Sequence, residues 1–319
     1  MRIKGVDFLL TFKCTARCVH CSYRASPEAQ GFMPLSNAER WLSELKENHP
    51  INTLTVHGGE PFLDTRLLAA VLKKAKELEI EKRWVITNSY WAISQTVAEE
   101  ILIDLKKAGL KSITFSVDAF HQEYTPLERI KVGLDAAVRI GLDAVAVDSY
   151  LLGSEKLQNK YNISTLELSD ELQEYSTVQF SRYLATFDGR GADNLAAYVP
   201  IDQKLPAGKC RFPFWLGGDI RNPEVVEIDF EGNVTLCPGL CIGNAAHGSL
   251  SKLLNDYDYQ RHPIISIIAE QNPIGLLELA ITRGYKGGRE FINECHLCYE
   301  MRRFLQPYYP EYLSPVTCY

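Results

Sequence analysis

Apolar runs of strand length alternate with segments of helical periodicity along residues 1–191. We expect strands over residues 6–12, 53–57, 84–87, 112–117, 144–150 and 177–184. Between the second and third of these runs, Leu68, Val71, Leu72 and Ala75 recur at the spacing of one helix face. Because apolar strands that alternate with helices favour a parallel sheet with right-handed crossovers, the pattern predicts an α/β fold in which six strand–helix units curl into a partial barrel. Ligands bind such sheets at the carboxyl ends of the strands.

Polar residues in front of the helical segments predict where helices begin. Ser36 and Glu39 have the spacing of a capping box, and Asp64 stands where the cap of the next helix is expected. Thr125 followed by Pro126 predicts a cap residue with proline at the first helical position.

The pattern changes after residue 191, where Gly, Pro and Cys become frequent and helical periodicity fades. We therefore expect two domains, a barrel at residues 1–191 and a smaller extension at residues 192–319. Within the extension, the apolar runs 225–230 and 234–236 flank Glu231-Gly232-Asn233, which predicts a β-hairpin.

The composition is that of a folded globular protein of about two domains. The chain has 319 residues, of which 46% are hydrophobic and 23% charged. A net charge of −6 leaves no basic excess for a phosphate backbone, which disfavours nucleic acid as a partner. No run reaches the roughly 18 apolar residues of a membrane span, so we expect a cytoplasmic protein without membrane contact. Nine cysteines in that compartment are more typical of metal ligands or reactive thiols than of disulfides.

Three cysteines follow the first predicted strand at a spacing that fits an iron-sulfur cluster. Cys14, Cys18 and Cys21 form a C-x3-C-x2-C loop. Three thiolates on one loop can bind three irons of a 4Fe-4S cluster and leave the fourth iron open to a ligand. Two alternatives remain: a zinc site completed by His20, and a chance grouping of buried cysteines.

Polar and glycine-rich motifs stand at the ends of the next predicted strands. They are His57-Gly58-Gly59-Glu60-Pro61, Thr87-Asn88-Ser89 and Ser116-Val117-Asp118, with Arg129 a little downstream. Together with the cysteine loop, this ordered set resembles the radical S-adenosylmethionine (radical SAM) superfamily, whose fold is a partial TIM-type barrel of (β/α)6 form.

The resemblance implies a cofactor site at these strand ends. It assigns a 4Fe-4S cluster to Cys14, Cys18 and Cys21, and SAM to Gly58, Gly59, Glu60, Pro61, Asn88, Ser89, Ser116, Asp118 and Arg129. Glu60 would accept a hydrogen bond from the ammonium of SAM, and Arg129 would pair with its carboxylate. Ala119 replaces the glycine that the superfamily often has after Ser-x-Asp. We interpret His20, His57 and His121 as packing or hydrogen-bonding residues.

The six remaining cysteines suggest a second metal site in the extension. Gly232 and Cys237 have the G-x4-C spacing of the hairpin that opens SPASM and twitch extensions in this superfamily. That likeness implies one auxiliary 4Fe-4S cluster held by Cys210, Cys237, Cys295 and Cys298, with Cys241 and Cys318 spare. A zinc site on Cys237, Cys241, Cys295 and Cys298 is the alternative. Cys241 could also replace Cys237 in a cluster, and Cys318 could be a ligand, a hydrogen donor or inert.

The resemblance implies an enzyme that cleaves SAM reductively to a 5′-deoxyadenosyl radical, which abstracts hydrogen from a substrate. The expected reaction modifies a peptide or protein side chain by oxidation, crosslinking or epimerisation, with help from the auxiliary cluster. A small-molecule dehydrogenase or epimerase is the alternative, because the four-cysteine spacing resembles that of a twitch-type inosamine dehydrogenase. A non-catalytic metal scaffold is a further alternative. The expected partners are the peptide or small-molecule substrate and a reductant such as flavodoxin or ferredoxin.

Overall fold

The computed structural model describes residues 1–201, 205–210, 217–288 and 290–319. The strands of the barrel part are β1 (Gly5–Leu9), β2 (Thr53–His57), β3 (Lys82–Thr87), β4 (Ser112–Ser116), β5 (Ala144–Leu151) and β6 (Gln179–Leu184). Its helices are α1 (Leu35–Asn48), η1 (Pro61–Asp64), α2 (Thr65–Glu77), α3 (Gln95–Ala108), α4 (Ala119–Gln122), α5 (Leu127–Arg139), α6 (Lys160–Glu171), α7 (Gly189–Asn194) and η2 (Ala196–Tyr198), where η marks a 3-10 helix.

The extension contributes short strands and helices. Its strands are β7 (Gly218–Asp219), β8 (Asn222–Pro223), β9 (Val225–Asp229), β10 (Asn233–Cys237) and β11 (Leu240–Asn244). Its helices are α8 (Leu250–Asn255), α9 (Ile265–Gln271), α10 (Gly275–Thr282), α11 (Glu294–Leu305), η4 (Gln306–Tyr308) and η5 (Val316–Cys318).

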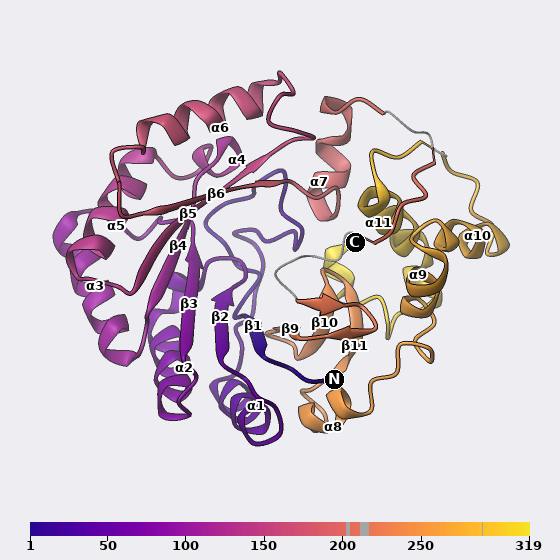
Figure 1. The fold of residues 1–319 in the computed structure, drawn as a ribbon, viewed down its shortest axis with the longest axis horizontal. Helices are drawn as coiled ribbons and strands as arrows, with labels where there is room; N and C mark the ends of the chain where they lie inside the picture. Colours follow the sequence, from indigo (N-terminus) through magenta and orange to yellow (C-terminus); the bar gives the residue numbers. More distant parts are fainter. Residues whose placement is uncertain (202–204, 211–216, 289) are drawn as a thin grey trace.

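One large sheet joins the two parts. In the described ranges its nine strands run in the order β11-β10-β9-β1-β2-β3-β4-β5-β6. Strands β9 and β1 to β6 are parallel, and β10 and β11 are antiparallel to their neighbours. Figure 1 shows β1 to β6 as an open arc with α1, α2, α3, α5 and α6 along its outer side. The predicted α/β fold with a parallel, partial barrel is confirmed.

The sheet has an apolar outer face and a mixed inner face, because side chains alternate along each strand. On β2, Leu54 and Val56 are fully buried in the core with the surrounding helices, whereas Thr53, Thr55 and His57 line an internal cavity. The inner face is therefore free to carry the polar groups of a site.

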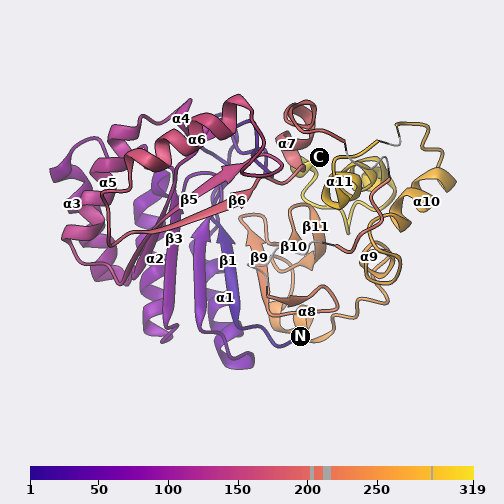
Figure 2. The same ribbon diagram turned by 45° about the horizontal axis from the view of Figure 1, so that its top comes forward.

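The predicted hairpin is confirmed, and it attaches to the edge of the barrel sheet. Strand β9 pairs in parallel with β1, and β10 folds back along β9. The predicted domain boundary after residue 191 falls within α7. The views in Figures 1 and 2 show β9 to β11 beside β1, with α9, α10 and α11 beyond them. Among the described residues, no helix combines the length and apolarity needed to cross a membrane.

Two predicted helix starts were wrong. Helix α1 begins at Leu35 with Pro34 as its N-cap, so Ser36 lies inside the first turn and makes no cap hydrogen bond. Helix α5 begins at Leu127, and Pro126, whose backbone is extended, is its N-cap rather than its first helical residue. The Asp64 cap is confirmed, because its side chain accepts a hydrogen bond from the Leu67 amide.

The first strand is shorter than expected and ends at Leu9 instead of residue 12. Beyond it the backbone carbonyls of Leu10, Phe12 and Lys13 accept hydrogen bonds from the amides of Met33, Ser26 and Glu60. The Leu10 amide still donates to the carbonyl of His57 on β2, and loops satisfy the carbonyls in front of the cysteine loop.

Asp64→Ala should lower the free energy of unfolding by about 1 kcal/mol, because the Leu67 amide loses its cap. Denaturant titration measures this change. Ser36→Ala is the matched control, since this exposed side chain caps nothing, and it should change stability by less than about 0.5 kcal/mol. Equal losses in both variants would contradict the assigned caps.

Candidate active site

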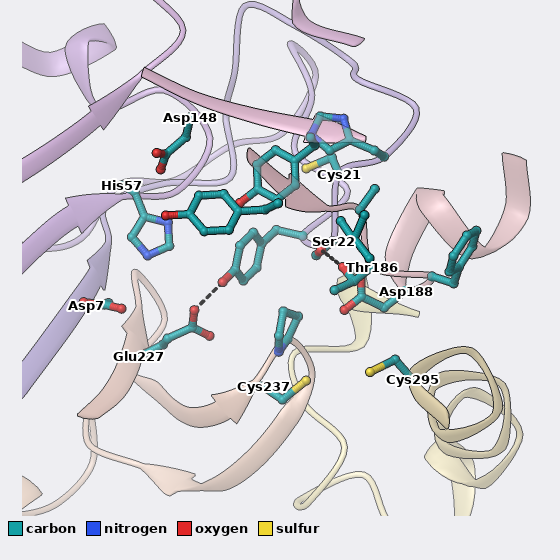
Figure 3. Close-up of a pocket in the computed structure, with 18 of the residues that line it drawn as sticks. Asp7, Cys21, Ser22, His57, Asp148, Thr186, Asp188, Glu227, Cys237 and Cys295 are labelled. Atoms are coloured by element: carbon teal, nitrogen blue, oxygen red, sulfur yellow. Dashed lines mark hydrogen bonds between the residues drawn. The ribbon is translucent and has the colours of Figure 1, made fainter. Parts of the chain in front are cut away.

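A cavity of about 1540 Å3 lies between the inner face of the barrel and the extension. Side chains from β1 to β6, β9, the cysteine loop and α11 line it, and Figure 3 shows part of this lining. All seven cysteines predicted as cluster ligands are among the lining residues, namely Cys14, Cys18, Cys21, Cys210, Cys237, Cys295 and Cys298.

Backbone hydrogen bonds to neighbouring segments fix the loop of Cys14, Cys18 and Cys21. The Cys14 amide donates to the carbonyl of Ser26 at 3.0 Å. Arg190 on α7 donates to the carbonyls of Cys18 at 2.8 Å and Ala25 at 2.6 Å. The loop is therefore held from both sides by hydrogen bonds to its backbone, while Cys14 Sγ also accepts a hydrogen bond from the Ala16 amide at 3.4 Å.

Cys14 and Cys18 are buried thiols. Burial, followed by the nearby Glu60 carboxylate, raises the pKa of Cys14 to about 12. Burial and the neighbouring Cys21 raise the pKa of Cys18 well above its usual value. Such thiols stay protonated on their own, whereas metal coordination deprotonates a thiol outright. The residues present fit an iron-sulfur cluster.

The glycine pair after β2 packs against the backbone that leads into the cysteine loop. The Gly59 amide donates to the Thr11 carbonyl at 2.6 Å. A Cβ atom on Gly59 would lie 2.0 Å from the Lys13 carbonyl oxygen, and one on Gly58 would lie 2.5 Å from the Thr11 carbonyl oxygen. Gly58 also has a φ of +132°, which side chains rarely allow. Both glycines line the cavity as well.

Glu60 bridges two strand-end loops. Its carboxylate accepts hydrogen bonds from the amides of Phe62 at 3.0 Å and Asn88 at 2.8 Å, and from the Thr87 hydroxyl at 2.9 Å. Burial raises the pKa of Glu60 to about 7, although these hydrogen bonds oppose the shift. The side chain is fully buried and is not part of the cavity lining. The predicted contact of Glu60 with the SAM ammonium stays a prediction.

The other predicted SAM residues divide into two groups. Asn88 and Ser116 line the cavity with Gly58 and Gly59, and the Asn88 amide lies 3.6 Å from the Cys14 sulfur. Outside the lining, Asp118 caps α4 and Arg129 donates to the Tyr90 carbonyl. Pro61 and Ser89 also lie outside the lining.

The histidines near the cysteine loop have local partners. His20 stacks on Phe120 with ring centroids 4.5 Å apart, and burial lowers the pKa of His20 to about 3. His121 Nδ1 lies 2.9 Å from Asp118 Oδ1. A neutral, stacked imidazole at position 20 agrees with the interpretation of this residue as a packing group.

In the extension, the predicted auxiliary ligands come from different segments. Cys237 ends β10, and Cys295 and Cys298 share one face of α11 because they are three residues apart. Figure 3 shows the sulfur atoms of Cys237 and Cys295 pointing toward one another. Burial raises the pKa of Cys237 well above its usual value, whereas Arg302 opposes this shift. These thiols also fit a metal cluster.

The two spare cysteines lie elsewhere. Cys241 is buried with its thiol 3.1 Å from the Gly243 carbonyl oxygen, and it does not line the cavity. Cys318 lies in η5, where it is almost fully buried and also outside the lining. Neither thiol faces the space that the other seven share.

Comparison with known proteins identifies the barrel. Residues 8–152, which include the cysteine loop and the ends of β2, β3 and β4, match the radical SAM superfamily. This region is a radical SAM domain.

Two curated relatives match parts of the chain. YydG of Bacillus subtilis, a protein named for peptide biosynthesis, is 27% identical over 128 residues, which are 40% of either chain. GTP 3′,8-cyclase of Clostridium acetobutylicum is 23% identical over 164 residues, 47% of this chain and 48% of the cyclase. The chain thus spans less than half the length of these relatives. The solved structure of histidine-tagged anSMEcpe with bound AdoMet shares the fold, with a TM-score of 0.51, 12% identity and 99% of either chain covered.

The structure adds a polar group that the sequence patterns did not single out. Asp7 on β1 and Glu227 on β9 are register partners, and their carboxylates lie within 4.8 Å of each other and of the His57 imidazole. The Tyr23 hydroxyl donates to Glu227, and Figure 3 shows Asp7, His57 and Glu227 close together. The available signal was the presence of acids in two apolar strands, Asp7 in β1 and Glu227 and Asp229 in β9. That Asp7 and Glu227 lie side by side follows only from the pairing of β1 with β9, which short sequence patterns do not reveal.

Replacing Gly59 by alanine should cost the radical SAM domain its cluster. The added methyl group collides with backbone that cannot move without shifting Cys14. We expect anaerobically reconstituted Gly59→Ala to bind less iron than the wild type, by about the four irons of one 4Fe-4S cluster. Gly248→Ala is the control, because nothing lies within 4 Å of its added Cβ. Full iron content in Gly59→Ala would show that the glycine contact is dispensable.

A pH dependence follows from the buried carboxylates. Burial raises the pKa of Glu227 from 4.5 to about 8, so the folded protein holds a proton that the unfolded chain releases between these values. The stability from this proton is present at low pH and is lost as the pH rises to about 8. Urea titrations from about pH 5 to about pH 8 should show a steeper loss of unfolding free energy for the wild type than for Glu227→Gln. Parallel profiles would contradict this assignment.

Proposed function

We propose that this chain is a radical SAM enzyme whose barrel binds SAM and one 4Fe-4S cluster and whose extension binds a second. The supporting observation is that one cavity is lined by all seven predicted ligand cysteines, whereas Cys241 and Cys318 lie outside it. The first cluster is assigned to Cys14, Cys18 and Cys21, and the second to Cys210, Cys237, Cys295 and Cys298.

The chemistry of the cofactors defines what the protein itself must do. When bound, a 4Fe-4S cluster and SAM supply one-electron cleavage of SAM and a 5′-deoxyadenosyl radical. The chain has to hold the reacting groups together and keep water away from them. Gly58, Gly59, Asn88 and Ser116 are the predicted SAM residues that reach the cavity, and the stacked ring of His20 closes the wall beside the cysteine loop.

The cavity has room for a peptide or protein side chain beside the cofactors. Small-molecule sites commonly occupy roughly 300–1,000 Å3, and this cavity of about 1540 Å3 is larger. That space accommodates the cofactors together with part of a second molecule. The partial similarity to YydG, which is named for peptide biosynthesis, points in the same direction. The reaction would be an oxidation, crosslink or epimerisation of a residue inserted into the barrel.

The lining of the cavity carries both acidic and basic side chains. Three carboxylates face the cavity from β1, β5 and β9, namely Asp7, Asp148 and Glu227. Burial raises the pKa of each, to about 7, 6 and 8. Five basic residues line the same cavity, so the charge of the lining does not exclude an anionic substrate; they are Lys4, Arg190, Lys209, Arg221 and Arg302. The small-molecule dehydrogenase or epimerase stays an alternative to the peptide substrate.

Cofactor content and SAM cleavage test the proposal. Anaerobically reconstituted wild type should carry about eight iron and eight sulfide and should convert SAM to 5′-deoxyadenosine with dithionite. The variant with Cys14, Cys18 and Cys21 replaced by Ala should keep about half the iron and lose SAM cleavage. The variant Cys295→Ala/Cys298→Ala should also keep about half the iron but still cleave SAM, because the open iron belongs to the first cluster.

Cys241→Ala is the matched control for the extension, and we expect it to retain all iron. Wild type that saturates at about four iron with one zinc would refute the auxiliary cluster in favour of the zinc alternative. Absence of SAM cleavage in wild type that carries all of its iron would refute the proposal that the chain is a radical SAM enzyme. Unfolding must be monitored in each variant, since loss of a metal site can unfold a small extension.

A further inference from the structure

Arg302 is a buried cation at the wall of the cavity that holds the extension cysteines. It lies on α11 four residues after Cys298, so both side chains occupy one face of the helix. Only 2% of Arg302 is exposed, and it lines the cavity. One terminal nitrogen donates to the Pro238 carbonyl at 2.8 Å and to the Tyr319 hydroxyl at 3.1 Å. The other lies 3.9 Å from the Cys237 sulfur.

The guanidinium has no carboxylate partner within the described residues. Its Nε atom is buried without a hydrogen-bond acceptor there. Asp188, which also lines the cavity, attracts it from beyond ion-pair distance. The next residue, Arg303, is by contrast half exposed and pairs with Asp193 and Glu300 at 2.7 Å each. A fully buried charge without a counter-charge is costly, so Arg302 requires a negative group close by.

The sulfur atoms of Cys237 and Cys298 are the groups that can provide this negative charge. Arg302 approaches the Cys237 sulfur, and its charge lowers the pKa of Cys298, against the larger effect of burial. As neutral thiols these two residues cannot balance the positive charge of Arg302. As thiolates bound to a cluster they would place the negative charge directly beside the guanidinium.

We propose that Arg302 is the buried counter-charge of the auxiliary cluster and raises its reduction potential. This inference rests on the auxiliary cluster of the proposed function. Reduction adds one electron and makes the cluster one charge more negative, so an adjacent cation stabilises the reduced form more than the oxidised form. Net charge, hydrogen bonds to sulfur and solvent exposure are the protein features that set such potentials, and Arg302 alters the first two. It is a positioning residue, since it acts through the cluster.

Redox titration monitored by electron paramagnetic resonance tests this role in the reconstituted holoprotein, with dithionite as the electron source. The Cys14, Cys18, Cys21 triple Ala variant identifies which signal belongs to the auxiliary cluster. In Arg302→Gln we expect the equilibrium constant for one-electron reduction of that cluster to fall at least tenfold. A tenfold fall corresponds to a midpoint potential about 59 mV more negative. Arg302→Lys, which keeps the charge, should lie closer to the wild type. Arg303→Gln is the matched control and should leave the midpoint unchanged.

Iron content separates the possible failures. If Arg302→Gln loses the auxiliary iron while Arg302→Lys keeps it at the wild-type potential, the requirement for charge is supported. If both variants lose it, the hydrogen bonds to Pro238 and Tyr319 are the essential feature, and the proposal is overturned. A wild-type potential in loaded Arg302→Gln overturns it as well. Wild type with only the first cluster would refute the auxiliary cluster of the proposed function, and this inference with it.

Discussion

The close packing of Gly58 and Gly59 against residues 11–13 is the constraint on which the cofactor site depends. It joins the end of β2 to the backbone that enters the cysteine loop, with the Gly59 amide 2.6 Å from the Thr11 carbonyl oxygen. Because no other residue fits this approach, the loop position and the strand ends are set together. The adjoining Glu60 extends the same arrangement to β3 through its hydrogen bonds to Thr87 and Asn88.

A second set of contacts ties the extension to this site. Strand β9 continues the barrel sheet beside β1, so the hairpin that carries Cys237 opens onto the barrel cavity. Arg24, three residues after Cys21, donates to the Cys318 carbonyl, to the Tyr299 hydroxyl at 2.9 Å and to Asp193 at 2.6 Å. Movement of the extension would therefore disturb the segment next to the cysteine loop. These contacts connect the segments that carry both groups of cysteines.

Features that depend on residues close together in the sequence could be predicted from sequence patterns. The spacing of Cys14, Cys18 and Cys21, the alternating strands and the Asp64 cap are all readable within short windows, and the sheet and the Asp64 cap were confirmed. The pairing of Asp7 with Glu227 was not predictable, because it depends on β9 joining β1 across more than half the chain. The cap at Ser36 failed for a different reason: Pro34 is the N-cap, so the helix begins two residues earlier than expected.

The cavity lining contains two buried acids, Asp7 and Glu227, and a buried cation, Arg302. Asp7 and Glu227 face each other without a basic ion-pair partner in the described part of the chain, and burial raises the pKa of both. Arg302 is a buried cation that no carboxylate of the same described ranges contacts. Protonation can neutralise the acids at little cost, but a guanidinium cannot lose its charge in this way. Arg302 therefore needs a bound anion beside it more strongly than Asp7 and Glu227 need a bound cation. Binding of an anionic cluster there would stabilise the extension in proportion to its affinity, which couples loading of the site to folding.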